Sequence, residues 1–428
     1  MTKPQLHISG VGGVGMNAIA QLLLSDGYHV IGSDRFADQG IHLPVLDQLK
    51  SLGLELVPQD GSALNKETQA LVISTAVEAD NPERLRAAEL NIPEKHRAEI
   101  LAEFTQRGPL VAIAGTSGKT TCTAWLGWVL TECGLNINMV NGGGITAWKK
   151  TGIPGNVRMG DPESWWVAEV DESDGSLLRF HPKFALINTI SEDHHSWEDT
   201  IELFRTFASQ VSDTIICGPG VAHYLEGTGP KLIELEAPLD VPLPGEHNAW
   251  NAAAVSALAS LCGVDMDRAK AAVQTFPGVE RRLELCSPPG SGPRVYDDYA
   301  HNPEKLLAAI RAVQPETGKL TVLWRPHGFA PLKQNFDAFV EIFALGLREQ
   351  DELLLLPVFY AGGTAPKGIG SEDLATVLLK QKVKVQVLLD FPDELELDQE
   401  DVLLVAGARD PELPVFAHRM GLKTANVR

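Results

Sequence analysis

Short runs of apolar residues recur along the chain, and the segments between them space their hydrophobic positions as helices do. The apolar runs predict buried strands at residues 6–9, 30–32, 71–74, 110–114, 165–170, 184–188, 214–217, 320–324, 353–357 and 402–406. Helical spacing is clearest at residues 18–25 and 83–90. Strands that alternate with helices in this way are typical of α/β domains with largely parallel sheets.

Two segments rich in proline and glycine interrupt this alternation. Arg107-Gly108-Pro109 precedes a new apolar run, and a second such turn occupies residues 286–293. At about 150 residues per domain, a chain of 428 residues suggests about three domains. We therefore predict domains at residues 1–107, 108–282 and 283–428.

A glycine-rich loop follows the first predicted strand. Gly10, Gly12 and Gly15 satisfy the pattern G-x-G-x-x-G between a strand and a helix, where glycine lets the backbone approach a diphosphate and the helix N-terminus supplies N–H donors. Asp34 ends the next strand, where a carboxylate suits a ribose hydroxyl. The pattern predicts a nucleotide diphosphate site, and an NAD site and a UDP-sugar site fit it equally. A turn that only packs a helix on a sheet is the structural alternative.

A second glycine loop follows the predicted strand at 110–114. Residues 115–121 read G-T-S-G-K-T-T, a shorter form of the phosphate loop in which Ile113 occupies the place of the usual first glycine. Backbone N–H groups of such a loop surround the β-phosphate, Lys119 reaches the β- and γ-oxygens, and the Thr120 hydroxyl binds Mg²⁺. The loop predicts an ATP site.

Carboxylates end the strand predicted at 165–170. Hard oxygen ligands suit Mg²⁺, so we expect Glu169 to be a buried ligand, with a hydrogen-bonded structural carboxylate as the alternative. The carboxylates at 171, 172 and 174 fit either a functional site or a solvated acidic turn. Asp193-His194 follows another strand, and this pair fits either a second Mg²⁺ site or a helix cap.

Composition narrows the classes of partner. Lysine and arginine number 36 and aspartate and glutamate 56, so the formal charge of −20 argues against nucleic acid and anionic membranes as partners. The five cysteines are scattered and form no C-x-x-C pair, which is typical of reduced thiols. Without a run of about 20 apolar residues, we expect a cytoplasmic protein. The sequence does not indicate its oligomeric state.

Taken together, these motifs resemble the Mur ligase family, the ATP-dependent amide ligases of peptidoglycan precursor synthesis. The resemblance covers most of the chain and also rests on Gly245–Asn251, Gly278–Glu284, Asp297–Pro303 and Arg325-Pro326-His327. It implies a Rossmann-like N-terminal domain, a central P-loop ATPase-like parallel sheet and a Rossmann-like C-terminal domain that binds the amine and closes over the site. The implied reaction joins L-alanine to UDP-N-acetylmuramate through an acyl phosphate, with ATP and Mg²⁺.

The resemblance also assigns roles to residues. The UDP-sugar site would comprise Gly12, Gly13, Val14, Gly15, Asp34 and Ser74. The ATP site would comprise Gly115, Thr116, Ser117, Gly118, Lys119, Thr120, Thr121, Asn248, Arg282 and Asp298. Thr120, Glu169 and His194 would bind metal. Lys119, His194, Arg325 and His327 would act in catalysis.

Three other functions stay open at this point. A ligase that recycles murein tripeptide fits residues 281–285 and 296–298. An oxidoreductase could use the first loop for NAD(P), although the second loop speaks against it. A non-catalytic nucleotide-binding relative is the third, because Ser117 stands where these ligases typically have histidine and residues 406–411 depart from the family pattern.

Overall fold

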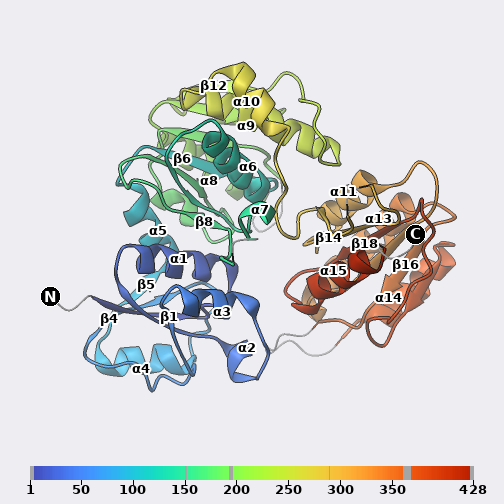
Figure 1. The fold of residues 1–428 in the computed structure, drawn as a ribbon, viewed down its shortest axis with the longest axis horizontal. Coiled ribbons are helices and arrows are strands. Elements are labelled where there is room, and N and C mark those ends of the chain that lie inside the picture. Colours follow the sequence, from blue (N-terminus) through green and yellow to red (C-terminus); the bar gives the residue numbers. More distant parts are fainter. Residues whose placement is uncertain (1–3, 150–151, 192–195, 289, 360–367, 425–428) are drawn as a thin grey trace. The chain divides into compact units, whose positions relative to one another are not determined.

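The computed structural model describes residues 4–149, 152–191, 196–288, 290–359 and 368–424. The chain forms two compact units. One consists of Met1–Pro242 and His247–Val279, and the other of Leu243–Glu246 and Glu280–Arg428. Figure 1 labels many of the elements of both units.

The first unit begins with a five-stranded sheet in the order β3-β2-β1-β4-β5. All four strand pairings are parallel. The strands are β1 (Gln5–Ser9), β2 (His29–Ser33), β3 (Glu55–Val57), β4 (Thr68–Ile73) and β5 (Glu94–His96). This is a doubly wound sheet with β1 at its centre, so the loop after β1 lies at the carboxyl edge where such sheets bind ligands.

A second sheet in the same unit has seven strands in the order β12-β11-β10-β6-β9-β7-β8. Within it, only the pairing of β7 with β8 is antiparallel among the described residues. The strands are β6 (Leu110–Ala114), β7 (Ile137–Val140), β8 (Val157–Arg158), β9 (Trp165–Glu169), β10 (Phe184–Ile187), β11 (Thr214–Cys217) and β12 (Lys231–Glu234). The carboxyl ends of β6, β9 and β10 therefore lie at one edge of the sheet, because β6 pairs in parallel with both β9 and β10.

The second unit contains a six-stranded sheet in the order β13-β14-β18-β15-β16-β17. Its strands are β13 (Glu284–Leu285), β14 (Arg294–Asp298), β15 (Leu320–Trp324), β16 (Glu352–Leu355), β17 (Val385–Val387) and β18 (Val402–Ala406). β13 runs antiparallel to β14, and the other pairings are parallel.

Helices connect the strands of each sheet. In the first unit they are α1 (Val14–Ser25), α2 (Arg35–Asp38), α3 (Pro44–Ser51), α4 (Pro82–Leu90), α5 (Arg97–Thr105), α6 (Lys119–Glu132), α7 (Thr146–Lys149), η1 (Ser176–Arg179), α8 (Trp197–Ser209), η2 (Ala222–Leu225), α9 (Glu246–Leu261) and α10 (Met266–Val273). The first residue of α9, Glu246, is assigned to the second unit. In the second unit they are α11 (Pro303–Val313), α12 (Phe329–Gln334), α13 (Phe336–Gly346), α14 (Ser371–Lys380) and α15 (Glu412–Thr424).

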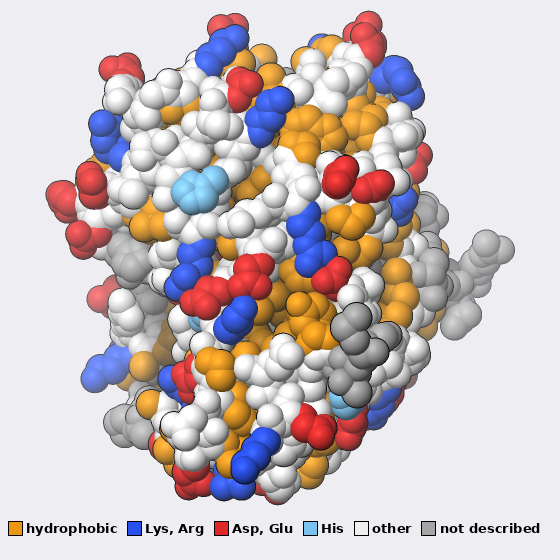
Figure 2. Space-filling model, turned by 90° about the vertical axis from the view of Figure 1, so that its left-hand side faces the viewer, with side chains coloured by type: hydrophobic (Ala, Val, Ile, Leu, Met, Phe, Trp, Pro, Cys, Tyr) orange, Lys and Arg blue, Asp and Glu red, His pale blue; other side chains and the backbone are white. Residues whose placement is uncertain are grey.

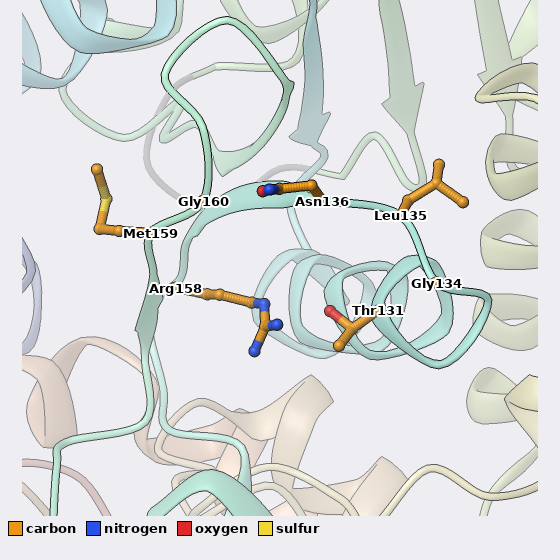
Figure 3. Close-up of a pocket in the computed structure, with 7 residues that line it drawn as sticks. All are labelled: Thr131, Gly134, Leu135, Asn136, Arg158, Met159 and Gly160. Atoms are coloured by element: carbon orange, nitrogen blue, oxygen red, sulfur yellow. The ribbon is translucent and has the colours of Figure 1, made fainter.

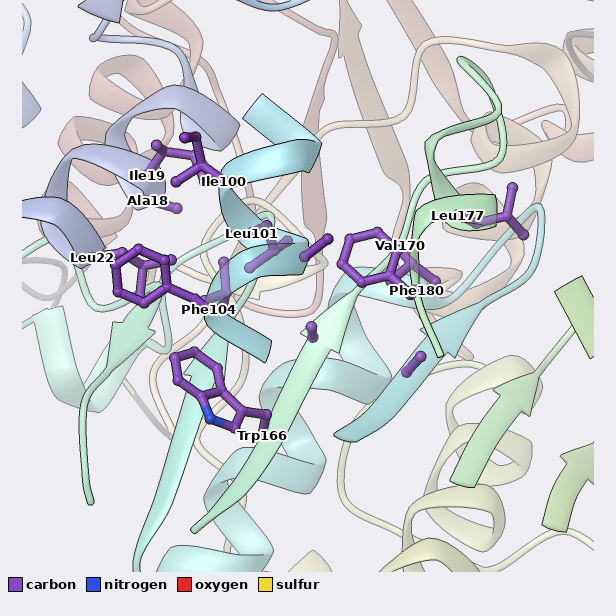
Figure 4. Packing of buried hydrophobic residues seen from close by; sticks show 14 of the residues in the cluster. Ala18, Ile19, Leu22, Ile100, Leu101, Phe104, Trp166, Val170, Leu177 and Phe180 are labelled. Carbon is purple, nitrogen blue, oxygen red and sulfur yellow. The ribbon is translucent and has the colours of Figure 1, made fainter. Parts of the chain in front are cut away.

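A single hydrophobic core joins the two sheets of the first unit. Leu22 of α1, Phe104 of α5 and Trp166 of β9 belong to the same buried cluster. The Phe104 and Trp166 rings meet edge to face with centroids 6.2 Å apart (Figure 4). Continuous burial of this kind is what makes residues 4–242 one compact unit rather than two, although the boundary predicted at residue 107 falls between α5 and β6 and stays a prediction.

All ten apolar runs predicted to be strands lie on strands of the structure, and the α/β class with largely parallel sheets is confirmed. The pattern missed β14 because three of its five residues are charged, and it missed several strands of two to four residues. The five cysteines are free thiols, four of them buried. Within the described residues, no helix is both long and apolar enough to cross a membrane.

Acidic and basic side chains are interspersed over the face shown in Figure 2. Neither sign of charge gathers in one continuous patch on this face.

Candidate active site

The second glycine loop is held open by hydrogen bonds from the neighbouring strand end. Thr189, which follows β10, accepts the N–H of Thr116 with its carbonyl oxygen at 3.0 Å and the N–H of Ser117 with its hydroxyl at 2.9 Å. Gly115 and Gly118 have φ angles of +125° and +82°, which only glycine adopts without strain. The loop thus has a fixed shape that ends at the N-terminus of α6.

Lys119, the first residue of α6, points back across this loop. Its Nζ donates to the carbonyl oxygen of Gly115 at 2.8 Å and to Oε2 of Glu172 at 2.6 Å. Burial by itself would lower the pKa of Lys119, but three carboxylates, Glu172 foremost, raise it overall. Burial raises the pKa of Glu172 more than Lys119 lowers it. Lys119 is therefore charged, and its ammonium group lies beside the loop.

Thr120 and Glu169 bring two hard oxygen donors together next to Lys119. The Thr120 hydroxyl donates to Oε1 of Glu169 at 3.0 Å, and the N–H of Gly142 donates to Oε2 at 2.7 Å. Glu169 is half-buried rather than buried as expected. The described residues contain no group of three or more His, Cys, Asp or Glu side chains that could hold a metal ion. Two protein oxygens fit Mg²⁺, which keeps several waters and phosphate ligands, better than they fit a metal bound by protein alone.

A chain of asparagines leads from the loop to α9. Asn188 Nδ2 donates to the Ser117 carbonyl at 3.3 Å and to Asn251 Oδ1 at 2.9 Å, and Asn251 in turn donates to Asn248 Oδ1 at 3.2 Å. All three asparagines are buried. The sequence predicts ATP binding for Asn248 but not for Asn188 or Asn251. Asn188 directly follows β10, and Asn251 belongs to the same segment as Asn248, Gly245–Asn251.

The first glycine loop is closed by Asp34. The N–H of Gly12 donates to Oδ2 of Asp34 at 2.9 Å, while Oδ1 caps α2 by accepting the N–H of Phe36 at 2.9 Å. Asp34 is buried and Val14 is exposed. Ser74 follows β4, the parallel neighbour of β1, so it lies at the same sheet edge. The residues predicted for the UDP-sugar thus gather at one edge of the first sheet.

One cation that the sequence did not single out lies beside this loop. A Cβ added at Gly15 would be 3.1 Å from Nη1 of Arg97, the first residue of α5. Nη2 of Arg97 lies 3.3 Å from Asp171 and 3.6 Å from Asp174. In the acidic turn after β9, Glu172 and the side chain of Asp174 are therefore buried and each faces a cation, whereas Asp171 is partly exposed.

The second unit carries its own cluster at the ends of β14 and β15. Asp298 is buried, and its two oxygens accept the N–H groups of Leu283 and Ala300 at 2.7 Å each. Burial raises the pKa of Asp298. The Arg282 guanidinium lies over the ring of Tyr299, 5.5 Å from its centroid. Arg282 and Asp298, both predicted for ATP, are thus neighbours.

Arg325 and His327 follow β15 in the same unit. Arg325 Nη1 is 2.7 Å from Asp410 Oδ2. The rings of His327 and His301 meet edge to face with centroids 4.9 Å apart. Burial lowers the pKa of His327, and it lowers the pKa of His301 to about 4, so both imidazoles are neutral at pH 7. His194 lies outside the described residues.

A pocket of about 360 Å³ lies at the end of α6 that is far from the phosphate loop (Figure 3). Thr131 and Gly134 line it at the end of α6, and Arg158 lines it from β8. The phosphate loop is at the opposite end of α6, about 18 Å away for a helix of this length. This pocket is therefore separate from the candidate active site.

Comparisons with known proteins agree with this arrangement. Residues 5–108 match the family model "Mur ligase family, catalytic domain", and residues 281–409 match "Mur ligase, glutamate ligase domain". A UDP-N-acetylmuramate–L-alanine ligase of Thermosynechococcus vestitus is 30% identical over 417 residues, covering 86% of this chain and 84% of that protein. One from Xanthomonas campestris pv. campestris is 32% identical over 462 residues, covering 95% and 93%.

Solved structures share the fold. The UDP-N-acetylmuramate–alanine ligase of Thermotoga maritima matches with a TM-score of 0.79 at 23% identity, over 99% of both chains. A murein peptide ligase of Psychrobacter arcticus matches with a TM-score of 0.70 at 19% identity, again over 99% of both chains.

Proposed function

The chain belongs to the Mur ligase family, and we propose that it joins L-alanine to the carboxylate of UDP-N-acetylmuramate at the expense of ATP. The observation that carries the proposal is the meeting of Lys119, Thr120, Glu169 and Glu172 around a phosphate loop, in a compact unit that holds a second glycine loop for another nucleotide. The L-alanine ligases to which the chain is similar over most of its length support the choice of amine.

Amide formation needs an activated carboxylate, because a carboxylate is a poor electrophile. The sugar carboxylate would attack the γ-phosphorus of ATP. This attack would form an acyl phosphate and release ADP. The amine would then attack the acyl carbon, lose a proton and expel phosphate. Charge that develops on the transferring phosphoryl group has to be stabilised by fixed donors.

The residues around the second loop fit that task. We propose that Lys119 leaves Glu172 for the β- and γ-phosphate oxygens, and that the loop N–H groups and Asn248 hold the rest of ATP. Thr120 and Glu169, with His194, would hold Mg²⁺, which when bound neutralises charge on the phosphates. The neutral imidazole of His327 and the guanidinium of Arg325 are proposed to act from the second unit.

Each of the three predicted domains would bind a different substrate. We propose that residues 1–107 bind the UDP-sugar at Gly12–Gly15, Asp34 and Ser74, that residues 108–282 bind ATP, and that residues 283–428 bring the amine. Arg282 and Asp298 would contact ATP from the last of these. A cytoplasmic location, where ATP is available and the free thiols stay reduced, completes the proposal.

Phosphate release tests the proposed function. Purified protein with ATP and Mg²⁺ is incubated with UDP-N-acetylmuramate and, in turn, L-alanine, glycine, L-serine and murein tripeptide. We expect phosphate only when the sugar nucleotide and L-alanine are both present. Release with the tripeptide instead would assign the recycling reaction, and no release with any amine would refute a ligase.

A further inference from the structure

The first glycine loop lacks a cation of its own. Residues 10–16 contain no lysine or arginine, whereas the second loop contains Lys119. A diphosphate carries two or more negative charges, and backbone N–H groups at a helix N-terminus supply only partial positive charge. A cation from elsewhere in the first unit is therefore the missing part of a diphosphate site.

Arg97 is placed to fill that gap. Its side chain lies against Gly15 in the first turn of α1. A Cβ added at Gly15 would be 3.1 Å from Nη1, 3.4 Å from Cδ and 3.5 Å from Cζ of Arg97. The other nearby arginine, Arg35, is paired with Glu78 at 2.6 Å, and both side chains are nearly half exposed. Arg97 is only 24% exposed, so its charge is less screened by solvent than that of Arg35.

The two ends of the Arg97 guanidinium have different surroundings. Nη2 is turned toward Asp171 and Asp174, while Nη1 is turned toward the glycine loop. Oδ2 of Asp174 is buried and makes no hydrogen bond within the described residues; Arg97 Nη2 lies 3.6 Å from it and His96 Nε2 3.7 Å, so it can still accept a hydrogen bond from Arg97. An arginine fork held by carboxylates at one end presents its other end in a fixed direction.

We propose that Arg97 binds the diphosphate of the nucleotide sugar, and that Asp171 and Asp174 are positioning residues that aim it at the first loop. This inference rests on the proposed function and adds to it a binding residue from α5 and a turn from the second sheet. A charge-assisted contact of this kind contributes about a 10- to 100-fold gain in affinity.

Calorimetric titration of UDP into the full chain tests the proposal. We expect Arg97→Ala to weaken UDP binding about 10- to 100-fold and Arg97→Lys to weaken it less, because lysine keeps the charge without the fork. In turnover, Arg97→Ala should raise the KM for UDP-N-acetylmuramate and leave kcat and the KM for ATP nearly unchanged.

Arg107→Ala is the matched control. Arg107 pairs with Asp26 at 2.7 Å, just past the C-terminal ends of the same two helices, α5 and α1. The Arg107 variant should bind UDP within about twofold of the parent while losing the same kind of ion pair. Thermal unfolding of both variants shows whether either loses its fold.

Asp174→Asn tests the positioning role. Asparagine can still accept the Ser176 N–H at 2.9 Å but no longer carries the charge near Arg97. This variant should weaken UDP binding about threefold in the parent and have no effect in the Arg97→Ala background, because the two changes act through one contact. Equal effects in both backgrounds would remove Asp174 from the proposal.

Two outcomes would overturn the assignment of Arg97, and a third would overturn the proposed function. Unchanged UDP binding by a folded Arg97→Ala protein would refute it. Weaker binding of UDP-N-acetylmuramate with unchanged binding of UDP would show that Arg97 contacts the sugar carboxylate, which also overturns the diphosphate assignment. If the parent binds no UDP at all, the proposed function fails instead.

Discussion

The two glycine loops occupy equivalent places in their sheets but obtain positive charge in different ways. Each follows a central parallel strand, β1 or β6, and leads into a helix. The second loop includes its own cation, Lys119, whereas the first has Arg97 brought to it by α5. Both cations meet carboxylates of one turn, residues 171–174.

The roles proposed for the two loops would account for this difference. A loop that stabilises a phosphoryl group during transfer needs a flexible charge that follows the reacting oxygens, and lysine provides a mobile point charge. A loop that only holds a diphosphate needs a fixed direction, and arginine provides it. Selective damage to each loop can separate these roles.

Replacing Lys119 should have the largest effect. We expect Lys119→Ala to lower kcat/KM about 100- to 1,000-fold, because the developing charge loses its main donor. UDP binding should remain at the parental level, since the first loop is untouched. Phosphate release and UDP calorimetry on one preparation measure both. Turnover at the parental rate would refute the role given to this loop.

Paired glycine substitutions should damage one loop at a time. A Cβ at Gly118 would collide with Asn188 Nδ2, lie 2.9 Å from Asn251 Oδ1 and strain a φ of +82°. A Cβ at Gly12 would lie 2.7 Å from Asp34 Oδ2 without such strain. We expect Gly118→Ala to raise the KM for ATP about tenfold, and Gly12→Ala to raise the Kd for UDP somewhat less.

Each of these glycine variants serves as the control for the other. Cross effects, with Gly12→Ala impairing ATP and Gly118→Ala impairing UDP, would contradict separate sites.

Asp34→Asn should affect only the first loop, and more weakly. Asparagine can still cap α2 through Oδ1, but its Nδ2 cannot accept the Gly12 N–H that now donates at 2.9 Å. Loss of that hydrogen bond should lower stability by about 1 kcal/mol and weaken UDP binding about fivefold. Denaturant unfolding and calorimetry test this, and tighter UDP binding by the variant would count against the loop assignment.

His96→Asn should have the smallest effect, visible only as a change in pH dependence. Burial lowers the pKa of His96, which faces Asp174, Arg97, Arg179 and Glu99. The unfolded chain therefore binds a proton below about pH 6.5 more readily than the folded chain does, so His96 reduces stability progressively as the pH falls.

The His96 variant keeps the helix cap, because asparagine can accept the Ala98 N–H as Nδ1 of His96 does at 3.3 Å. Melting temperatures between about pH 7.5 and pH 5 should fall less steeply for His96→Asn than for the parent. Parallel curves would show that His96 does not titrate differently in the two states. Other histidines contribute equally to both proteins and cancel in the comparison.

Sequence predicted the strands and both loops well, because those signals are local. Buried strands need apolar runs, and the loops need glycine at particular places. β14 escaped because Asp297 and Asp298 are buried in it, which is tolerable only because Arg281 lies 3.1 Å from Asp297 and backbone N–H groups bind Asp298. Arg281 is 16 residues from Asp297 and Leu283 is 15 residues from Asp298, and no local pattern reveals partners at such separations.

The parts of the site that sequence missed depend on contacts between distant segments. Arg97 lies far from the first glycine loop in the sequence, so its place beside that loop emerges only when α5 packs against α1 and the turn after β9. From the sequence alone, Glu172 fits either a functional site or a solvated turn. Its burial against Lys119 depends on how the first unit packs. The roles of the individual site residues remain predictions for the experiments above.

The buried cysteines make the native chain a quiet background for spectroscopic labels. Thiol reagents attack the thiolate, and burial raises the pKa of all five thiols, to about 12 at Cys217 and Cys262. A cysteine introduced at Leu85 in the first unit or at Leu345 in the second, positions that are 54% and 65% exposed, would react far faster. A pair of spin labels at these positions would then record the distance between the two units as ATP, nucleotide sugar and amine are added in turn, without first removing any natural cysteine.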